Sequence, residues 1–176
     1  MTRVKKGDFI EINYIGRVKQ TNEIFDLTDE KLAHEQQLPH QHRLGPVIIC
    51  VGEAQILQGL DENLMGKEIG KSYNIGLDAE HAFGKKDPSL MKIVPFSVFK
   101  KQNVNVFPGM QVNIDNLLGV VRVVSGGRVI VDFNHPLAGR DVAYELTILR
   151  IVEDKQEEIQ SLFSILGIPV EINLEE

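Results

Sequence analysis

The sequence predicts an α+β protein in which a small all-β unit is inserted into a mixed first domain. Two observations support this class. Before residue 80 the apolar residues switch between the two-residue period of strands and the helical period, whereas residues 86–136 show strand patterns and turn residues. Residues 141–152 then form a long alternating strand, so the middle unit interrupts the first domain, and its two ends are expected to lie close together at the surface.

The first domain begins with a half-buried strand at residues 8–18, where Ile10, Ile12 and Tyr14 alternate with polar residues. Residues 19–46 are polar and rich in turn residues, so we expect them to cross the surface. Three further elements are expected before residue 80: a buried strand at 46–51, an amphipathic helix at 56–66 that ends at a glycine, and an alternating strand at 72–77.

The inserted unit begins after Gly84, where Pro88 and Pro95 mark a boundary. Beyond them, runs rich in Val and Ile at 110–124 and 128–133, joined by Ser-Gly-Gly, predict an antiparallel hairpin. The connection back to the first domain is Asn-His-Pro-Leu-Ala-Gly, and we interpret its histidine as part of a hinge. The predicted domains are a discontinuous first domain of residues 1–85 and 137–152, an inserted domain of residues 86–136 and an extension of residues 153–176.

The C-terminal extension combines a helix and a strand. Apolar residues between Ile159 and Leu166 recur at helical spacing, and residues 170–174 alternate as a strand. Residues 153–176 hold seven acids and one base, which accounts for the whole net charge of −6. The rest of the chain is neutral and has no basic stripe, so we expect no nucleic-acid partner.

Composition favours a protein of the cytoplasm. The longest apolar runs are five residues, far below the roughly 20 needed to cross a bilayer, so no membrane partner is expected. The single cysteine, Cys50, lies inside an apolar run and is expected to be a buried small hydrophobe. One cysteine cannot form an internal disulfide, which suits a reducing compartment.

Two motifs imitate known sites without completing them. Gly-Lys-Glu-Ile-Gly-Lys-Ser resembles a phosphate-binding loop, but the position of its first glycine is Met65. His-Glu-Gln-Gln-Leu imitates a zinc-protease motif, but Leu38 stands at the second ligand position. His40 and His42 could bind a metal adventitiously, and we expect no metal site with a function there. No pattern indicates a nucleophile or an acid–base pair.

Four segments carry more information together: INYIGRV, IFDLTDE, VGEAQILQGLDENLMGKEIGKSYNI with AEHAFG, and VAYELTILRI. In combination they resemble FKBP-type peptidyl-prolyl cis-trans isomerases. The residues after AEHAFG, with GKKDPSLMKIVP and FNHPLAGRDVAYE, narrow the resemblance to the SlyD-like subgroup and to its archaeal members. That subgroup carries an insert-in-flap chaperone domain at this point. The resemblance covers residues 4–152 and implies an antiparallel FKBP-type sheet wrapped on a short helix, with no cofactor and no metal.

The chemistry of prolyl isomerisation agrees with the lack of a catalytic triad. Rotation about an X-Pro bond meets a barrier of roughly 18–20 kcal/mol because it destroys amide resonance. Lowering that barrier requires a dry pocket for the prolyl ring that favours the twisted amide, and no proton relay. The resemblance assigns a catalytic set of Tyr14, Asp26, Leu57, Phe83 and Tyr144 and a substrate-binding set of Phe25, Val47, Ile56 and Leu60.

Within this set the resemblance implies distinct roles. The backbone N–H of Leu57 is expected to hold the substrate carbonyl beyond the proline, and Asp26 is expected near the twisting carbonyl, fixed by Tyr14. Leu60 stands where many family members have Trp, and Phe83 stands where most have Tyr. Losing that hydroxyl donor is expected to weaken binding of peptides or macrolide inhibitors. Without the resemblance, these apolar residues would be read as ordinary core.

The inserted unit is too small to bury all of its apolar residues, so an exposed patch that captures unfolded chains is expected. Its partners would be unfolded or partly folded proteins and proline-containing peptides. Two alternatives remain: a fully buried small core without a client site, and a binding-only chaperone with little isomerase activity. The residues predicted for the patch are Leu90, Met91, Ile93, Val94, Phe96, Val98 and Phe99.

Overall fold

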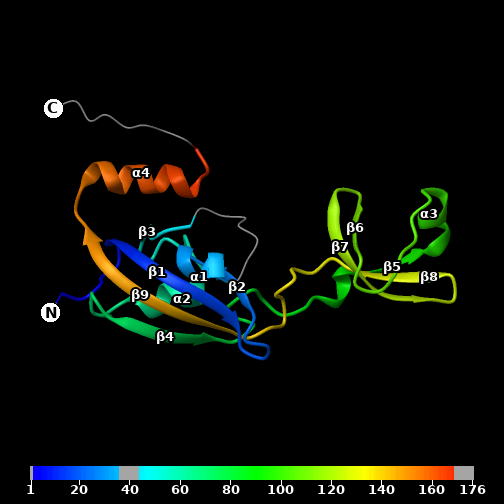
Figure 1. The fold of residues 1–176 in the computed structure, drawn as a ribbon, viewed down its shortest axis with the longest axis horizontal. Helices are drawn as coiled ribbons and strands as arrows, with labels where there is room; N and C mark the ends of the chain where they lie inside the picture. Colours follow the sequence, from blue (N-terminus) through cyan, green and yellow to red (C-terminus); the bar gives the residue numbers. More distant parts are fainter. Residues whose placement is uncertain (1, 36–43, 169–176) are drawn as a thin grey trace. The chain divides into compact units, whose positions relative to one another are not determined.

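The computed structural model describes residues 2–35 and 44–168, which form two compact units (Figure 1). The main unit comprises the described residues up to Phe83 and from Arg140 onward. The insert, as we call the second unit, is Gly84–Gly139. The predicted histidines His40 and His42 and the predicted strand at 170–174 lie outside the described residues.

The main unit is an antiparallel sheet of five strands. The order is β2-β1-β9-β4, and β3 pairs with the first half of β1 on the same side as β2. Helix α2 lies against this sheet, and α4 contacts β3. The strands are β1 (Phe9–Val18), β2 (Ile24–Leu27), β3 (Val47–Cys50), β4 (Ser72–Leu77) and β9 (Val142–Val152), and the helices are α1 (Glu30–Glu35), α2 (Gln58–Leu64) and α4 (Lys155–Ile165).

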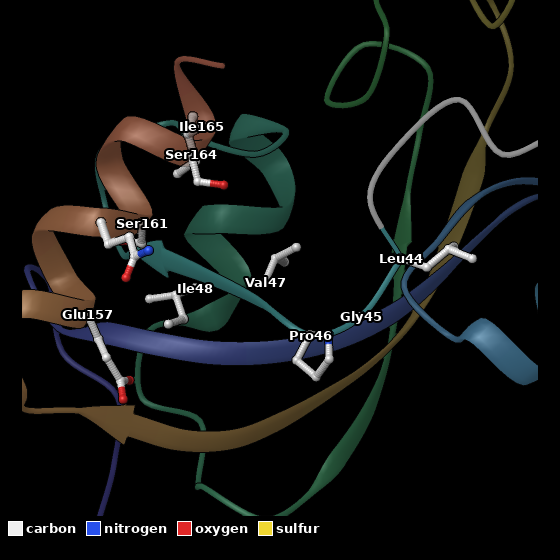
Figure 2. A pocket seen from close by; sticks show the side chains of 10 residues that line it. Leu44, Gly45, Pro46, Val47, Ile48, Glu157, Ser161, Ser164 and Ile165 are labelled. Atoms are coloured by element: carbon white, nitrogen blue, oxygen red, sulfur yellow. The ribbon is translucent and has the colours of Figure 1, made fainter. Parts of the chain in front are cut away.

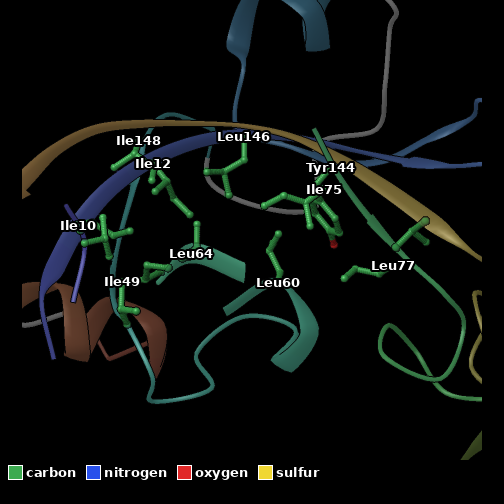
Figure 3. Packing of buried hydrophobic residues seen from close by; sticks show 13 residues of the cluster. Ile10, Ile12, Ile49, Leu60, Leu64, Ile75, Leu77, Tyr144, Leu146 and Ile148 are labelled. Atoms are coloured by element: carbon green, nitrogen blue, oxygen red, sulfur yellow. The ribbon is translucent and has the colours of Figure 1, made fainter. Parts of the chain in front are cut away.

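The core of the main unit lies between the sheet and α2. Figure 3 shows Leu60 and Leu64 of α2 pointing toward Ile12, Leu146 and Ile148 on the sheet, which curves around the helix. All five side chains are buried, because alternate residues of β1 and β9 face inward while the helix presents one side. Burying each such side chain stabilises the fold by roughly 1.5–3 kcal/mol.

The stretch predicted as a surface excursion contains regular structure. Residues Ile24–Leu27 form β2, which pairs with the second half of β1, and Glu30–Glu35 form α1. The expected surface excursion did not include this strand and helix, because a four-residue edge strand among polar residues has too few periods to stand out.

Helix α4 begins at a capping residue and is tied to the sheet by an ion pair. The carboxylate of Asp154 accepts the N–H groups of Gln156 and Glu157 at 2.8 and 3.0 Å. The guanidinium of Arg150 on β9 contacts Glu157 at 2.7 Å and Glu11 at 2.8 Å. The helix predicted from its apolar spacing is thus present, and it begins four residues earlier, at Lys155.

The insert is a four-stranded antiparallel sheet in the order β5-β8-β7-β6, with a core centred on Val121, Val129 and Val131. It also contains a helix that the strand-only prediction did not include. The run expected as one strand at 110–124 is divided by a turn at Asp115 and Asn116, both at positive φ. Its elements are η1 (Pro88–Leu90), β5 (Met91–Pro95), α3 (Phe96–Lys101), β6 (Gln111–Ile114), β7 (Leu117–Ser125) and β8 (Arg128–Asp132).

The two connections of the insert are joined to each other by hydrogen bonds. The N–H of Gly139 donates to the carbonyl of Gly84 at 2.8 Å. Asp87 and Asn134 exchange two bonds, from the Asp87 N–H to the Asn134 amide oxygen and from the Asn134 amide to the Asp87 carbonyl. The His135 ring nitrogen Nδ1 accepts the N–H of Leu137 at 3.1 Å. This histidine therefore shapes a turn of the connection.

Candidate active site

Four aromatic rings from four different segments meet at one end of the main core. We call Tyr14, Phe25, Phe83 and Tyr144 the aromatic cluster. The ring of Phe25 lies edge-on to Tyr144 (centroids 5.7 Å apart, 89°) and to Phe83 (5.6 Å, 85°), and Tyr14 lies edge-on to Tyr144 (5.8 Å, 65°). Such geometries are the favourable ones for aromatic pairs. The structure therefore brings four of the nine predicted pocket residues into direct contact.

A glycine in β1 makes room for this packing. A Cβ added at Gly16 would lie 2.8 Å from Cζ of Phe25 and 3.0 Å from Cε1 of Tyr144. The register pairs Gly16 with Asp26 on β2 and with Tyr144 on β9. Any larger residue here would push the two rings away from the strand, so the side-chain-free position is what allows them to converge.

A polar pair, Tyr14 with Asp26, lies beside these rings. The Tyr14 hydroxyl donates to Oδ2 of Asp26 at 3.1 Å. Burial raises the pKa of Tyr14 well above its usual value, and the charge and hydrogen bond of Asp26 raise it further. The pKa of Tyr144 is raised in the same direction, first by burial and then by the charges of Asp26 and Tyr14. Both hydroxyls therefore stay protonated at neutral pH, and the hydroxyl of Tyr14 donates to Asp26.

Thr28 is a residue of this site that sequence reasoning missed. It is buried, and its hydroxyl accepts the N–H of Tyr14 at 2.9 Å and lies 3.0 Å from the amide oxygen of Asn13. The Thr28 N–H in turn donates to the Tyr14 carbonyl. These bonds fix the backbone of Tyr14 beyond the last ladder pair of β1 and β2. The sequence shows a threonine two residues after Asp26, but its burial and its bonds to Tyr14 depend on the pairing of β1 and β2, which the local sequence does not reveal.

Helix α2 and the two residues before it supply three of the aliphatic residues predicted for the pocket. Leu57 is the N-cap residue of α2, and its carbonyl accepts the N–H groups of Leu60 and Asp61. Within the part of the chain that the structure describes, no protein acceptor takes the N–H of Leu57, as is normal at the start of a helix. Ile56 and Leu57 are half-buried against the core, whereas Leu60 is only 2% exposed and belongs to the core itself.

Val47 lies on β3, half-buried against the main core. Its position also borders a groove between β3 and α4, with a volume of about 520 Å³ (Figure 2). Other lining residues are Ile48, Ser161, Ser164 and Ile165. None of the ring contacts of the aromatic cluster involves Val47, so its place in the substrate-binding set remains a prediction.

The apolar patch predicted on the insert is partly at the surface. Leu90, Met91, Ile93 and Val98 are exposed, with Ile93 the most exposed at 63%. Phe99 is only 4% exposed and belongs to the core of the insert, so placing it in an exposed patch was wrong. Phe99 lies on α3. The sequence prediction contained only strands here and so could not show which side of a helix faces the core.

Two residues of the predicted patch are half-buried, and the insert exposes further apolar residues that were not predicted. Val94 and Phe96 are half-buried against the insert core. Leu117 and Leu118 are exposed by 60% and 63%, immediately after the Asp115–Asn116 turn. Large exposed apolar residues of the insert that the sequence analysis did not single out for the patch are Phe107, Leu117, Leu118 and Val123.

Within residues 2–35 and 44–168, no group of three or more His, Cys, Asp or Glu side chains could hold a metal ion. No helix in the same ranges is long and apolar enough to cross a membrane. The aromatic cluster therefore offers an apolar surface beside a hydroxyl–carboxylate pair, and the start of α2 offers a backbone N–H donor.

Comparison with known proteins gives two family matches. The FKBP-type peptidyl-prolyl cis-trans isomerase model matches residues 1–100, and the model described as FKBP26, IF domain, matches residues 92–137. The chain therefore belongs to the FKBP-type peptidyl-prolyl cis-trans isomerase family and is an isomerase of the SlyD-like kind.

Individual relatives support the same assignment. A short-type peptidyl-prolyl cis-trans isomerase of Methanocaldococcus jannaschii is 26% identical over 146 residues, covering 82% of this chain and 92% of that protein. An FKBP-type peptidyl-prolyl cis-trans isomerase SlyD of Yersinia pestis is 32% identical over 119 residues, or 65% of this chain and 60% of that protein. The FKBP-type 16 kDa isomerase of Escherichia coli strain K12 is 30% identical over 112 residues, covering 60% and 74% respectively.

Proposed function

We propose that the X-Pro bond of a client rotates against the aromatic cluster, between the β1–β2 end of the sheet and the start of α2. The observation that carries this proposal is the contact of four rings around a single polar pair, Tyr14 with Asp26. An apolar cavity wall with few polar groups suits a prolyl ring, and a planar amide loses charge separation as it twists. Each ~1.4 kcal/mol of preference for the twisted amide gives a tenfold faster rate.

Three groups have separable tasks in this scheme. The backbone N–H of Leu57 donates a hydrogen bond to the client carbonyl that follows the proline, and no proton is transferred. Tyr14, held protonated by burial and by Asp26, orients that carboxylate. Asp26 then lies beside the carbonyl that twists. Because no proton is transferred in any step, the reaction is not expected to depend on a titrating base.

The insert adds a second binding surface in this proposal. Exposed apolar residues at Ile93, Leu117 and Leu118 would hold an unfolded client weakly while its prolines reach the isomerase site. Linking two weak sites raises the local client concentration by tethering, without any new contact. Partly folded proteins in the cytoplasm and proline-containing peptides are the proposed substrates, and macrolides are the proposed inhibitors.

The test compares the intact chain with a variant whose residues 85–138 are replaced by a short Gly/Ser loop. Gly84 and Gly139 are already hydrogen-bonded at 2.8 Å, so a short loop can join them. We expect both proteins to isomerise a proline tetrapeptide, and only the intact chain to accelerate refolding of a reduced, proline-limited protein efficiently. Equal refolding rates would remove the role of the insert. Failure of both proteins on the tetrapeptide would favour the binding-only chaperone.

A further inference from the structure

The segment Asp78–Phe83 carries Phe83 from the end of β4 to the aromatic cluster. It consists of turns, so side chains and neighbouring backbone must hold it in place. One such contact is internal: Oδ1 of Asp78 accepts the N–H of His81 at 3.0 Å and lies 2.7 Å from its ring nitrogen Nδ1. Both of these side chains are exposed, so this contact caps the turn and does not attach it to the sheet.

A second contact presses the segment against helix α2. A Cβ added at Gly59 would lie 2.6 Å from the carbonyl oxygen of His81 and 3.1 Å from Cδ2 of Leu77. The backbone of the turn therefore rests directly on the helix. This contact restricts movement toward α2, but it does not stop movement away from it.

The third contact comes from Asp141, the residue immediately before β9. Its Oδ1 accepts the N–H of Ala79 at 2.9 Å, across 62 positions of the chain. Its own carbonyl accepts the N–H of Lys19, just after β1. One residue thus attaches the turn to the end of β1 and to the start of β9, the strands that carry Tyr14 and Tyr144.

We propose that Asp141 is a positioning residue of the isomerase site: its carboxylate holds the Asp78–Phe83 turn so that Phe83 stays in the aromatic cluster. The inference rests on the proposed pocket. Phe83 is the last residue before the insert and Asp141 is the second after it, so the link joins the two chain segments that flank the insert. In this role Asp141 keeps the Phe83 ring edge-on to Phe25.

The test uses Asp141→Asn and Asp141→Ala in the full chain, with Glu145→Ala on the exposed side of β9 as the matched control. Asparagine keeps an acceptor oxygen for the Ala79 N–H, and alanine removes it. With a proline tetrapeptide, we expect Asp141→Ala to raise KM at least fivefold with little change in kcat. Asp141→Asn and the control should stay within twofold. Hydrogen exchange at the Ala79 amide should accelerate in the alanine variant only.

A double-mutant cycle separates positioning from general stability. If Asp141 acts through Phe83, Asp141→Ala should cause no further rise of KM in a Phe83→Ala background. Equal effects of Asp141→Ala in both backgrounds, or an asparagine variant as impaired as the alanine variant, would overturn the inference. If Phe83→Ala alone leaves KM unchanged, the pocket assignment itself fails. If it raises KM while Asp141→Ala does not, only the positioning role fails.

Discussion

The buried carboxylate of Asp132 predicts how the insert responds to acid. Its side chain is 2% exposed. Oδ1 accepts the backbone N–H of Asn134 and its side-chain amide at 3.0 and 2.8 Å, and Oδ2 accepts from Arg122 at 3.1 Å and Lys86 at 3.3 Å. Burial alone would raise the pKa of this carboxyl, but the bonds from Asn134, Lys86 and Arg122 outweigh it and lower the pKa to about 2.

The size and the pH window follow from this shift. The pKa falls from 3.8 to about 2, and each unit corresponds to 1.36 kcal/mol, so the ionised group stabilises the insert by about 2 kcal/mol. Because the folded pKa is the lower one, this stabilisation is complete above about pH 4. It is lost as the pH falls from about 4 to about 2.

The assay is hydrogen exchange of the insert amides in the full chain, since the three tyrosines lie in the main unit and do not report on the insert. We expect Asp132→Asn to lower the opening free energy of the insert at pH 6 by about 2 kcal/mol or more. The difference between wild type and variant should shrink by about 2 kcal/mol at pH 2. A difference that is the same at both pH values would refute the reasoning.

Four further predictions concern the aromatic cluster and the exposed apolar surface of the insert. Gly16→Ala should destabilise the main unit by about 1–3 kcal/mol in urea unfolding, because its Cβ would overlap Phe25; an unchanged midpoint would show that the rings move freely. Tyr14→Phe removes the hydroxyl that holds Asp26 and should lower kcat/KM for a proline tetrapeptide about tenfold, with a melting temperature close to wild type. Phe83→Tyr adds a hydroxyl donor to the pocket and should tighten macrolide binding in a calorimetric titration. Weaker binding would show that the hydroxyl at position 83 does not point toward the bound ligand. Leu118→Ser should leave tetrapeptide turnover intact but weaken retention of an unfolded client, measured as suppression of its aggregation.

The sequence predicted those elements whose apolar period is long enough to be unambiguous. Strands β1, β4 and β9 and helices α2 and α4 each repeat their pattern several times, and all five are present. Strand β2 was missed because four residues contain only two periods. The turn at Asp115 and Asn116 was missed because neither residue is glycine, although both adopt positive φ, which Asn and Asp tolerate better than most residues.

The site was predictable only as far as family resemblance reaches. Tyr14, Phe25, Phe83 and Tyr144 come from segments that share no local pattern, and their meeting depends on strand register. The supporting residues Thr28 and Asp141 escaped prediction for the same reason. Their hydrogen bonds span 14 and 62 positions, and nothing in the local sequence distinguishes a buried threonine or a bridging aspartate from an exposed one.

The most direct test of the proposed isomerase site is NMR of the intact protein with a proline tetrapeptide. Exchange spectra of the peptide report the rate of cis–trans interconversion, and amide shifts of the protein report where the peptide binds. We predict faster interconversion with the largest shifts at Leu57 and at the aromatic cluster. Accelerated interconversion with shifts confined to other surfaces would contradict the assignment, because catalysis would then occur away from these rings.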